Sequence, residues 1–254
     1  MTPETEPYIL TLDEVDSTNT YVREHFDMLP DLALVTAKFQ TAGRGRLGRK
    51  WIAPPGVNFS GTFCFKNVPD GFLAGIFCGV ALMETVKELL PGNEDFYLKW
   101  PNDLYFGKAK AAGLLGEGVI RNGRLAGVAM GIGLNVNTSA EDLQGAGQAA
   151  VSLKMVAQKE FNVDFVTKLL AKSLNVCYIK YSNSVDALFD KWRSANKLIG
   201  KNIAVVDSCG VRHEGLFADV TETGEMVLES VDEKGERLRQ VFNCGDVSVD
   251  KSTI

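Results

Sequence analysis

The fold is decided by the stretch Val57-Asn58-Phe59-Ser60-Gly61-Thr62-Phe63-Cys64-Phe65, in which two kinds of side chain alternate. Apolar residues and one glycine take the odd positions, and small or polar residues take the even positions. Successive side chains of a strand point to opposite faces of a sheet. The alternation therefore predicts a strand with one face packed in a core and one small, polar face that is able to line a cleft.

The segments around this strand predict an α+β protein. Apolar residues recur at helical spacing over residues 73–90 and stop before Pro91-Gly92, which predicts a helix. A turn signal, Arg121 to Arg124, lies between two apolar runs, so residues 111–120 and 125–135 should form a β-hairpin. Further strands are expected at 8–12, 32–39 and 96–99, and further helices at 16–26 and 149–196, the last with a break near Asn162.

The character of the chain changes after Asn196. From there to the C-terminus, short strand-like runs are separated by turns that contain glycine. This pattern is typical of a small β-barrel. We therefore expect two domains, residues 1–196 and residues 197–254.

Composition excludes several classes of protein. The chain has 254 residues, 45% of them apolar, and a net charge of −5, which argues against a general nucleic-acid binder. No apolar run reaches the roughly 18 residues of a membrane span, and the acidic N-terminus does not resemble a secretory signal. Five cysteines without a CxxC pair, and only two histidines, argue against a zinc site and favour a reduced, cytoplasmic setting.

The segment from Thr41 to Trp51, T-A-G-R-G-R-L-G-R-K-W, is strongly basic although the whole chain is acidic. Its glycines allow the backbone to approach a phosphate and donate N–H groups, and its arginines supply permanently charged, forked donors. A polyanion is the ligand that suits both features. A solvated basic loop is the alternative reading of this segment alone.

Three further segments carry polar groups that suit a ligand site. They are Lys99-Trp100-Pro101-Asn102-Asp103, Gly107-Lys108-Ala109-Lys110-Ala111-Ala112-Gly113-Leu114 and Gly131-Ile132-Gly133-Leu134-Asn135-Val136-Asn137. Each also has a purely structural reading: the first as a turn, the second as a strand whose lysines face water, and the third as a capped bend.

Taken together and in this order, these segments resemble the signature of the biotin protein ligases. Asp16-Ser17-Thr18-Asn19 and Gln40 match the biotin-pocket elements of that family, and residues 200–249 resemble its C-terminal barrel. The resemblance implies a mixed β-sheet catalytic domain flanked by helices, of the class II synthetase-like biotin/lipoate ligase type, plus a small C-terminal β-barrel. Repressor-type members carry an N-terminal winged helix-turn-helix. Because the first strand is expected near Tyr8, we expect a monofunctional ligase without a DNA-binding domain.

The resemblance also implies the chemistry: biotin is activated by ATP and Mg²⁺ as biotinyl-5′-AMP and is then transferred to a lysine of a biotin carboxyl carrier protein. Lys110 and Arg46 are the implied catalytic residues. The implied biotin-binding residues are Ser17, Thr18, Asn19, Gln40, Gly43, Arg44 and Gly113. The implied ATP- and adenylate-binding residues are Arg46, Arg49, Trp51, Lys99, Asn102, Asp103, Asn135 and Asn137, with Asp103 also on the metal.

Two other functions stay open at this point. A lipoate or octanoate ligase or transferase would share the fold, and a transferase would need a nucleophilic cysteine beside a lysine. A non-catalytic biotin- or nucleotide-binding protein would have lost the reactive lysine, whereas Lys110 is present. Biotin, ATP and the carrier domain are the expected partners, with neither DNA nor a membrane. An edge strand of the main sheet could pair either with a second copy, giving a homodimer, or with the carrier domain, and the pattern does not choose between them.

Overall fold

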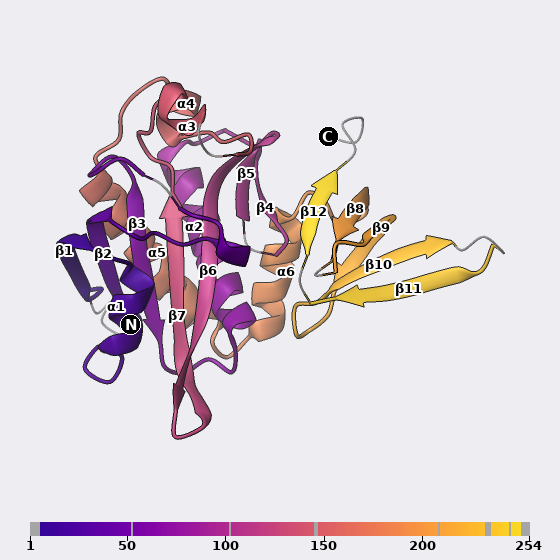
Figure 1. The fold of residues 1–254 in the computed structure, drawn as a ribbon, viewed down its shortest axis with the longest axis horizontal. Helices are drawn as coiled ribbons and strands as arrows, with labels where there is room; N and C mark the ends of the chain where they lie inside the picture. The colour runs from indigo at the N-terminus through magenta and orange to yellow at the C-terminus, as the bar shows by residue number, and fades with distance from the viewer. Residues whose placement is uncertain are drawn as a thin grey trace.

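The computed structural model describes residues 6–249, except residues 52, 102, 145–146, 208, 232–234 and 244. Its centre is a seven-stranded sheet in the order β1-β2-β3-β7-β6-β5-β4 (Figure 1). The β1–β2 pair is parallel and every other neighbouring pair is antiparallel, which confirms the predicted mixed sheet. The strands are β1 Ile9–Val15, β2 Ala33–Gln40, β3 Phe59–Phe65, β4 Phe96–Lys99, β5 Asp103–Phe106, β6 Ala109–Arg121 and β7 Arg124–Leu134.

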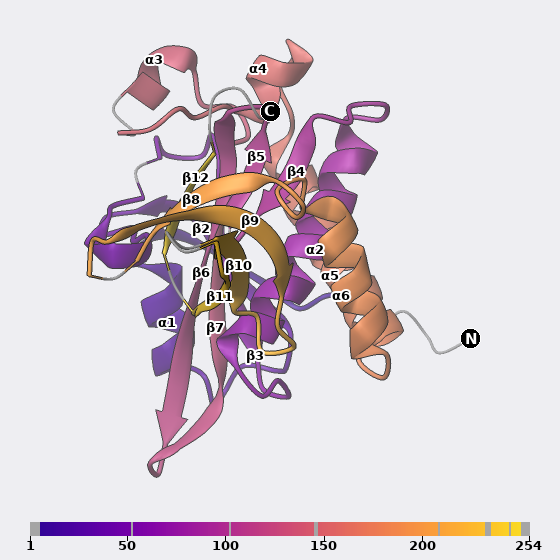
Figure 2. The same cartoon turned by 90° about the vertical axis from the view of Figure 1, so that its right-hand side faces the viewer.

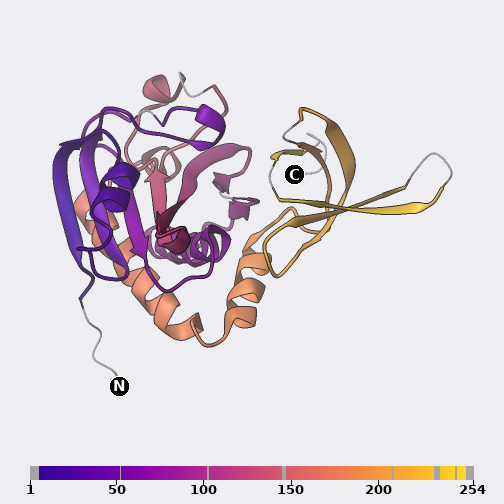
Figure 3. The same ribbon diagram turned by 60° about the horizontal axis from the view of Figure 1, so that its bottom comes forward.

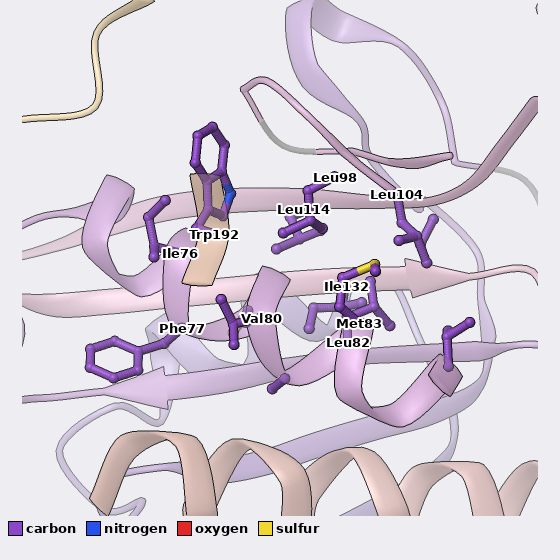
Figure 4. Close-up of a cluster of buried hydrophobic side chains, with 14 of the residues drawn as sticks. Ile76, Phe77, Val80, Leu82, Met83, Leu98, Leu104, Leu114, Ile132 and Trp192 are labelled. Atoms are coloured by element: carbon purple, nitrogen blue, oxygen red, sulfur yellow. The ribbon is translucent and has the colours of Figure 1, made fainter. Parts of the chain in front are cut away.

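The two faces of this sheet differ as the alternation in β3 predicts. Phe59, Phe63 and Phe65 are buried in the main apolar cluster, together with side chains of α2 (Gly71–Leu89) and α5 (Val163–Tyr181). Figure 4 shows side chains of α2 packed between that helix and the strands. The opposite face carries α1 (Thr18–Glu24) (Figure 2). Val22 of this helix belongs to a second, smaller apolar cluster. Beyond that cluster the same face presents small and polar residues.

The hairpin of β6 and β7 is also confirmed. Arg121 pairs with Arg124 across the turn, and the two residues between them both have positive φ, 51° for Asn122 and 74° for Gly123. Two-residue hairpin turns with positive φ at both positions match the right-handed twist of the strands, and Asn-Gly is the pair that favours them.

The helical region is shorter and more divided than expected. Residues 149–152 are extended because they pair with β6, and the helices are α3 Ala140–Leu143, α4 Leu153–Ala157, α5 and α6 Val185–Ala195. The break at Asn162 is confirmed, since its side chain caps α5 by accepting a hydrogen bond from the backbone N–H of Phe165 at 2.9 Å. None of the helices in the described part of the chain combines the length and apolar character that a bilayer crossing requires.

The C-terminal part is a five-stranded antiparallel sheet in the order β11-β10-β9-β8-β12, strongly curled beside α6 (Figure 3). Its strands are β8 Asn202–Val206, β9 Arg212–Val220, β10 Met226–Val231, β11 Arg237–Phe242 and β12 Asp246–Val249. The sequence predicts a small β-barrel here, and the structure has a small antiparallel sheet. Within the described residues β11 and β12 stand at its two edges, so the ladder is that of an open barrel.

The division near residue 196 stays a prediction. The element type changes there from helix to strand, as expected. However, buried side chains from both parts, such as Phe217, Met226 and Trp192, belong to one apolar cluster.

Candidate functional site

The small-residue face of the sheet is the base of the candidate site. Ser60, Gly133, Gly113 and Asp103 stand opposite one another on β3, β7, β6 and β5 and form one row across the sheet. The two glycines in the middle have no side chain, so other groups can approach the backbone between the two polar side chains. A row of this kind provides a floor on which a ligand can lie close to the main chain.

A β-bulge aims Lys110 at this row. The register of β5 and β6 shifts by one residue between Leu104 and Tyr105, so β6 carries an extra residue at this point. Bulges re-aim side chains and are frequent beside active sites. As a result Lys110, three positions before Gly113, lies on the same face of the sheet: a Cβ on Gly113 would stand 3.0 Å from both Cε and Nζ of Lys110. Gly113 is therefore the residue that leaves space for this lysine.

Lys110 and Asp103 form a largely buried ion pair. Nζ of Lys110 lies 2.7 Å from Oδ1 of Asp103, and the two side chains are only 17% and 18% exposed. Among the described residues Oδ1 has no hydrogen bond of good angle, so this contact is an ion pair rather than a directed hydrogen bond. A partly buried ammonium with one carboxylate beside it keeps donors for a second anion.

The main chain of Lys110 is fixed as well. Its N–H donates to the carbonyl of Ala149 at 2.9 Å, and its carbonyl accepts from the N–H of Val151 at 3.0 Å. This pairing is the reason that residues 149–152 are extended and not helical. It holds Lys110 from the side opposite to β5.

A polar recess lies beside the glycine floor, at the start of α1. Oε1 of Gln40 accepts from the N–H and the hydroxyl of Thr18 at 2.8 and 3.1 Å. Thr62 lies 2.8 Å from the hydroxyl of Thr18 and 2.6 Å from Oδ1 of Asn19, and its single proton serves one of these acceptors at a time. Nδ2 of Asn19 donates to the carbonyl of Leu115 at 3.1 Å. Ser17, at the N-cap of α1, is buried and does not cap the helix with its side chain.

The basic segment forms a small hairpin with a 3₁₀ turn, η1 (Arg46–Gly48), at its tip. The N–H of Gly45 donates to the carbonyl of Arg49 at 2.7 Å, and the N–H of Trp51 donates to the carbonyl of Gly43 at 3.0 Å. A Cβ on Gly43 would lie 2.5 Å from the carbonyl oxygen of Trp51, so a glycine is needed there.

This hairpin borders a cleft of about 1050 Å³. The opposite wall includes Leu114 to Glu117 of β6 and Phe72 of α2. Arg46 and Arg49 line the cleft from the hairpin. Arg44 lines it too, but its guanidinium contacts the carboxylate of Glu117 at 3.0 Å and the hydroxyl of Thr20 at 3.2 Å.

Trp51 covers the glycine floor. A Cβ on Gly133 would lie 2.3 Å from Cε2 of Trp51, so the indole is packed directly on that glycine. The indole Nε1 is buried and has no hydrogen-bond partner among the described residues. Leaving a buried donor unpaired costs about 1–3 kcal/mol, so this position of the indole is one that a ligand can displace.

Two other residues implied by the resemblance stand next to the Lys110 pair. Lys99 is the register partner of Asp103 across β4 and β5, and the N–H of Asn135 donates to the carbonyl of Ala111 at 2.9 Å. The side-chain amide of Asn135 donates to the carbonyl of Val151 at 3.2 Å, and that of Asn137 pairs with both backbone groups of Phe161. Nζ of Lys99 lies 3.3 Å from the hydroxyl of Tyr105. Their assignment to ATP stays a prediction, as does that of Asn102, which lies outside the described residues.

Three residues that the structure brings into the site are not among the residues predicted from the sequence. Thr62 completes the polar recess, Gly133 forms the floor under Trp51, and Glu117 holds Arg44. The small-residue positions of β3 were a signal for Thr62, and the Gly131–Asn137 motif was a signal for Gly133. For Glu117 the sequence offers no local signal, because its partner lies far along the chain.

The donor set suits a magnesium ion that is held mainly by its phosphate ligand. No group of three or more His, Cys, Asp or Glu side chains that could hold a metal occurs among the described residues. Asp103 supplies the one carboxylate of the row. Its buried Oδ1 has no hydrogen bond among the described residues and faces the ammonium of Lys110. Mg²⁺ commonly takes one or two carboxylates, with phosphate oxygens and water completing its shell.

The fold and the site together are a mixed sheet with a glycine floor, a lysine–aspartate ion pair and a basic hairpin beside a cleft. Residues 12–135 match the Biotin/lipoate A/B protein ligase family, and this part of the chain belongs to that family.

The chain is similar to proteins that are named as ligases. The chain is 35% identical over 132 residues to the "Bifunctional ligase/repressor BirA" of Escherichia coli (strain K12). This alignment covers 50% of the chain and only 40% of that longer relative. It is 26% identical over 244 residues to the "Biotin--[acetyl-CoA-carboxylase] ligase" of Paracoccus denitrificans, covering 93% of the chain and 98% of that relative. The fold matches that of the biotin protein ligase from Aquifex aeolicus in complex with biotin and ATP, with a TM-score of 0.76 and 24% identity over 95% of the chain and 97% of that protein.

Proposed function

We propose that this protein is an ATP-dependent ligase that joins biotin to a lysine of a biotin carboxyl carrier protein. The observation that carries the proposal is the ammonium of Lys110, held 2.7 Å from Asp103 at the edge of the glycine floor. The relative from Paracoccus denitrificans is named as a ligase of biotin and acetyl-CoA carboxylase, which supports the proposal. ATP is a cytoplasmic co-substrate, and we place the reaction in that compartment.

In the first half-reaction, a carboxylate oxygen of biotin attacks the α-phosphorus of ATP. A P–O bond forms, the bond to the β-phosphate bridge breaks, and pyrophosphate leaves. Two anions must come together, so positive charge in fixed positions lowers the barrier. Lys110 supplies that charge between carboxylate and phosphate, Arg46 supplies it from the hairpin, and Mg²⁺, when bound, neutralises phosphate charge beside Asp103.

In the second half-reaction, the amine of the carrier lysine attacks the carbonyl carbon of the mixed anhydride. An amide bond forms, AMP leaves, and the amine releases its proton to solvent. Lys110 stabilises the oxygen that develops negative charge. Cys64 and Cys177 offer no alternative nucleophile, because burial raises the pKa of Cys64 to about 11 and that of Cys177 to about 12.

The recess at the start of α1 suits the ureido ring of biotin. Oε1 of Gln40 is taken up by Thr18, so its Nε2 amide is left to donate to a ligand oxygen. The hydroxyl protons of Thr18 and Thr62 are used within the recess, so these hydroxyls offer lone pairs as acceptors, and the second amide proton of Asn19 adds a donor. A few directed polar groups in a small pocket fix the orientation of such a ligand.

A transfer assay tests the proposal. The protein is incubated with ATP, Mg²⁺, biotin and a biotin carboxyl carrier domain, and the intact mass of the carrier is followed. We expect a single added biotinyl group, which requires ATP and is absent from a carrier whose acceptor lysine is changed to arginine. A carrier that stays unmodified while a known biotin ligase modifies it would contradict the proposal.

A further inference from the structure

One contact joins the C-terminal sheet to the turn that carries Asp103. Trp100 is almost fully buried, and its indole Nε1 donates a hydrogen bond to the carbonyl of Gly224 at 2.9 Å. Gly224 lies in the turn between β9 and β10. Trp100 is followed directly by Pro101, which borders the cleft. Asp103, two residues after Pro101, begins β5. The C-terminal sheet therefore holds the chain just before the carboxylate that pairs with Lys110.

Only glycine fits at the contact point. Gly224 has φ +86°, and a Cβ built there would lie 2.1 Å from the ring atoms of Phe72. Phe72 lines the cleft and packs against the rings of Phe189 and Trp192 in α6. Because those rings are themselves packed, Phe72 cannot yield without disturbing its neighbours.

The turn that presents Gly224 is itself braced. The N–H of Gly224 donates to the carbonyl of Thr221 at 2.9 Å, and the N–H of Thr221 donates to that of Glu225 at 2.8 Å. Nε of Arg193 in α6 contacts Oδ1 of Asp219 at 2.9 Å. The turn is thus attached to the main body on two sides, through Trp100 and through Arg193.

We propose that Gly224 is a positioning residue of the adenylation site: it holds Trp100 and thereby sets the place of Asp103 and the Lys110 ammonium. This inference rests on the proposed function and gives the C-terminal sheet a part in it. Neither Gly224 nor Trp100 needs to touch biotin. A shift of about 1 Å in a catalytic group is enough to cost one to two orders of magnitude in rate.

The chain offers a matched control for Gly224→Ala. Gly210, in the turn between β8 and β9, has φ +80°, and a Cβ there would meet nothing within 4 Å. Gly210→Ala therefore carries the same backbone strain without the contact with Phe72. Trp100→Phe is the second test variant, since it keeps an aromatic ring and removes the hydrogen-bond donor.

The experiment measures biotin-dependent pyrophosphate release by the full chain, with kcat and KM for biotin and for ATP, and thermal unfolding of each variant. We expect Gly224→Ala and Trp100→Phe to lower kcat about tenfold relative to Gly210→Ala, with KM for biotin unchanged, because the recess at Thr18 and Gln40 is separate. In an Asp103→Asn background, Gly224→Ala should have an effect of less than about twofold, since residues that act through one group are not additive.

The inference is overturned if Gly224→Ala and Trp100→Phe have the same kcat as Gly210→Ala. It is also overturned if their loss appears only in KM for biotin, or if the losses in kcat multiply fully when Gly224→Ala is combined with Asp103→Asn. A folding failure of Gly224→Ala leaves the decision to Trp100→Phe. The proposed function fails separately, if the unaltered protein releases no pyrophosphate in response to biotin.

Discussion

The ammonium of Lys110 lies against Gly113 and beside the carboxylate of Asp103, and these contacts give it a fixed place. Lys110→Gln keeps most of the side-chain length and removes the charge. We expect adenylate formation to fall at least about 100-fold, as when a charge that stabilises a transition state is lost. Pyrophosphate release measures it. Lys87→Gln, at an exposed position on α2, is the control and should keep full activity.

The glycine under Lys110 permits a second residue-scale prediction. Gly113→Ala places a Cβ 3.0 Å from Cε and Nζ of Lys110 and 3.5 Å from Oδ1 of Asp103, so the ion pair must move. We expect kcat to fall about tenfold or more while the protein stays folded. Gly79→Ala, in the interior of α2 with its nearest neighbour at 3.4 Å, is the matched control and should retain activity. Equal rates for the two variants would contradict the role given to Gly113.

Single residues in this site were partly predictable. The identity of Lys110 and of the arginines stood out in the sequence. The position of the Lys110 side chain could not be predicted, because the β-bulge that turns it toward Gly113 depends on the pairing with β5. The pairing of Glu117 with Arg44 was hidden for the same reason, since it joins segments distant in the chain.

At the scale of elements, the hairpin from Gly43 to Trp51 must move for a ligand to reach the glycine floor. Trp51 is packed on Gly133, and its buried N–H has no acceptor among the described residues. We predict that trypsin cleaves at Arg44 to Lys50 in the free protein, and that biotin with ATP slows this cleavage several-fold as the hairpin closes over the adenylate. Mass spectrometry of the fragments measures the rates.

The exposed turn at Arg124 provides the internal control for that measurement. It lies at the tip of the β6–β7 hairpin, away from the cleft lining, and its cleavage should not respond to biotin and ATP. If the two sites respond alike, or if neither responds, the hairpin is not the lid that we infer.

Elements with local signals were predicted well, and elements set by distant pairing were not. The alternation in β3, the Asn122-Gly123 turn and the cap at Asn162 all act within a few residues, and the structure has all three. Residues 149–152 were expected to be helical, but they pair with the backbone of Lys110 instead. The strand β5 was not predicted, because its four residues are too few to show a period.

At the scale of the whole molecule, buried thiols are expected to lower the free energy of unfolding at alkaline pH. Burial raises the pKa of Cys64 to about 11 and that of Cys177 to about 12, from 9.0 in the unfolded chain. The folded state therefore gains stability below pH 9 that is lost as the pH rises toward those values. Between pH 7 and pH 10 we expect the free energy of unfolding to drop by about 3 kcal/mol from these two groups.

Urea unfolding at the two pH values measures that drop. Cys177→Ala, the control, should start less stable at pH 7 because of the lost packing, and should then lose about 1.4 kcal/mol less between pH 7 and pH 10. An unchanged slope with pH in this variant would show that the thiol of Cys177 does not contribute.

The arrangement of the whole molecule was the least predictable level. The change from helix to strand after α6 was visible in the sequence. The hydrogen bond from Trp100 to Gly224 and the close approach of Gly224 to Phe72 were not. Such a contact depends on two surfaces that meet only when both parts are folded.

Pyrophosphate release tests most directly whether the site at Lys110 and the glycine floor activates biotin. The protein is supplied with ATP and Mg²⁺, and with biotin, lipoate, octanoate or no acid in parallel. We predict release that depends on biotin, with little response to the other acids. Release with lipoate or octanoate but not with biotin, or none with any acid, would contradict the account.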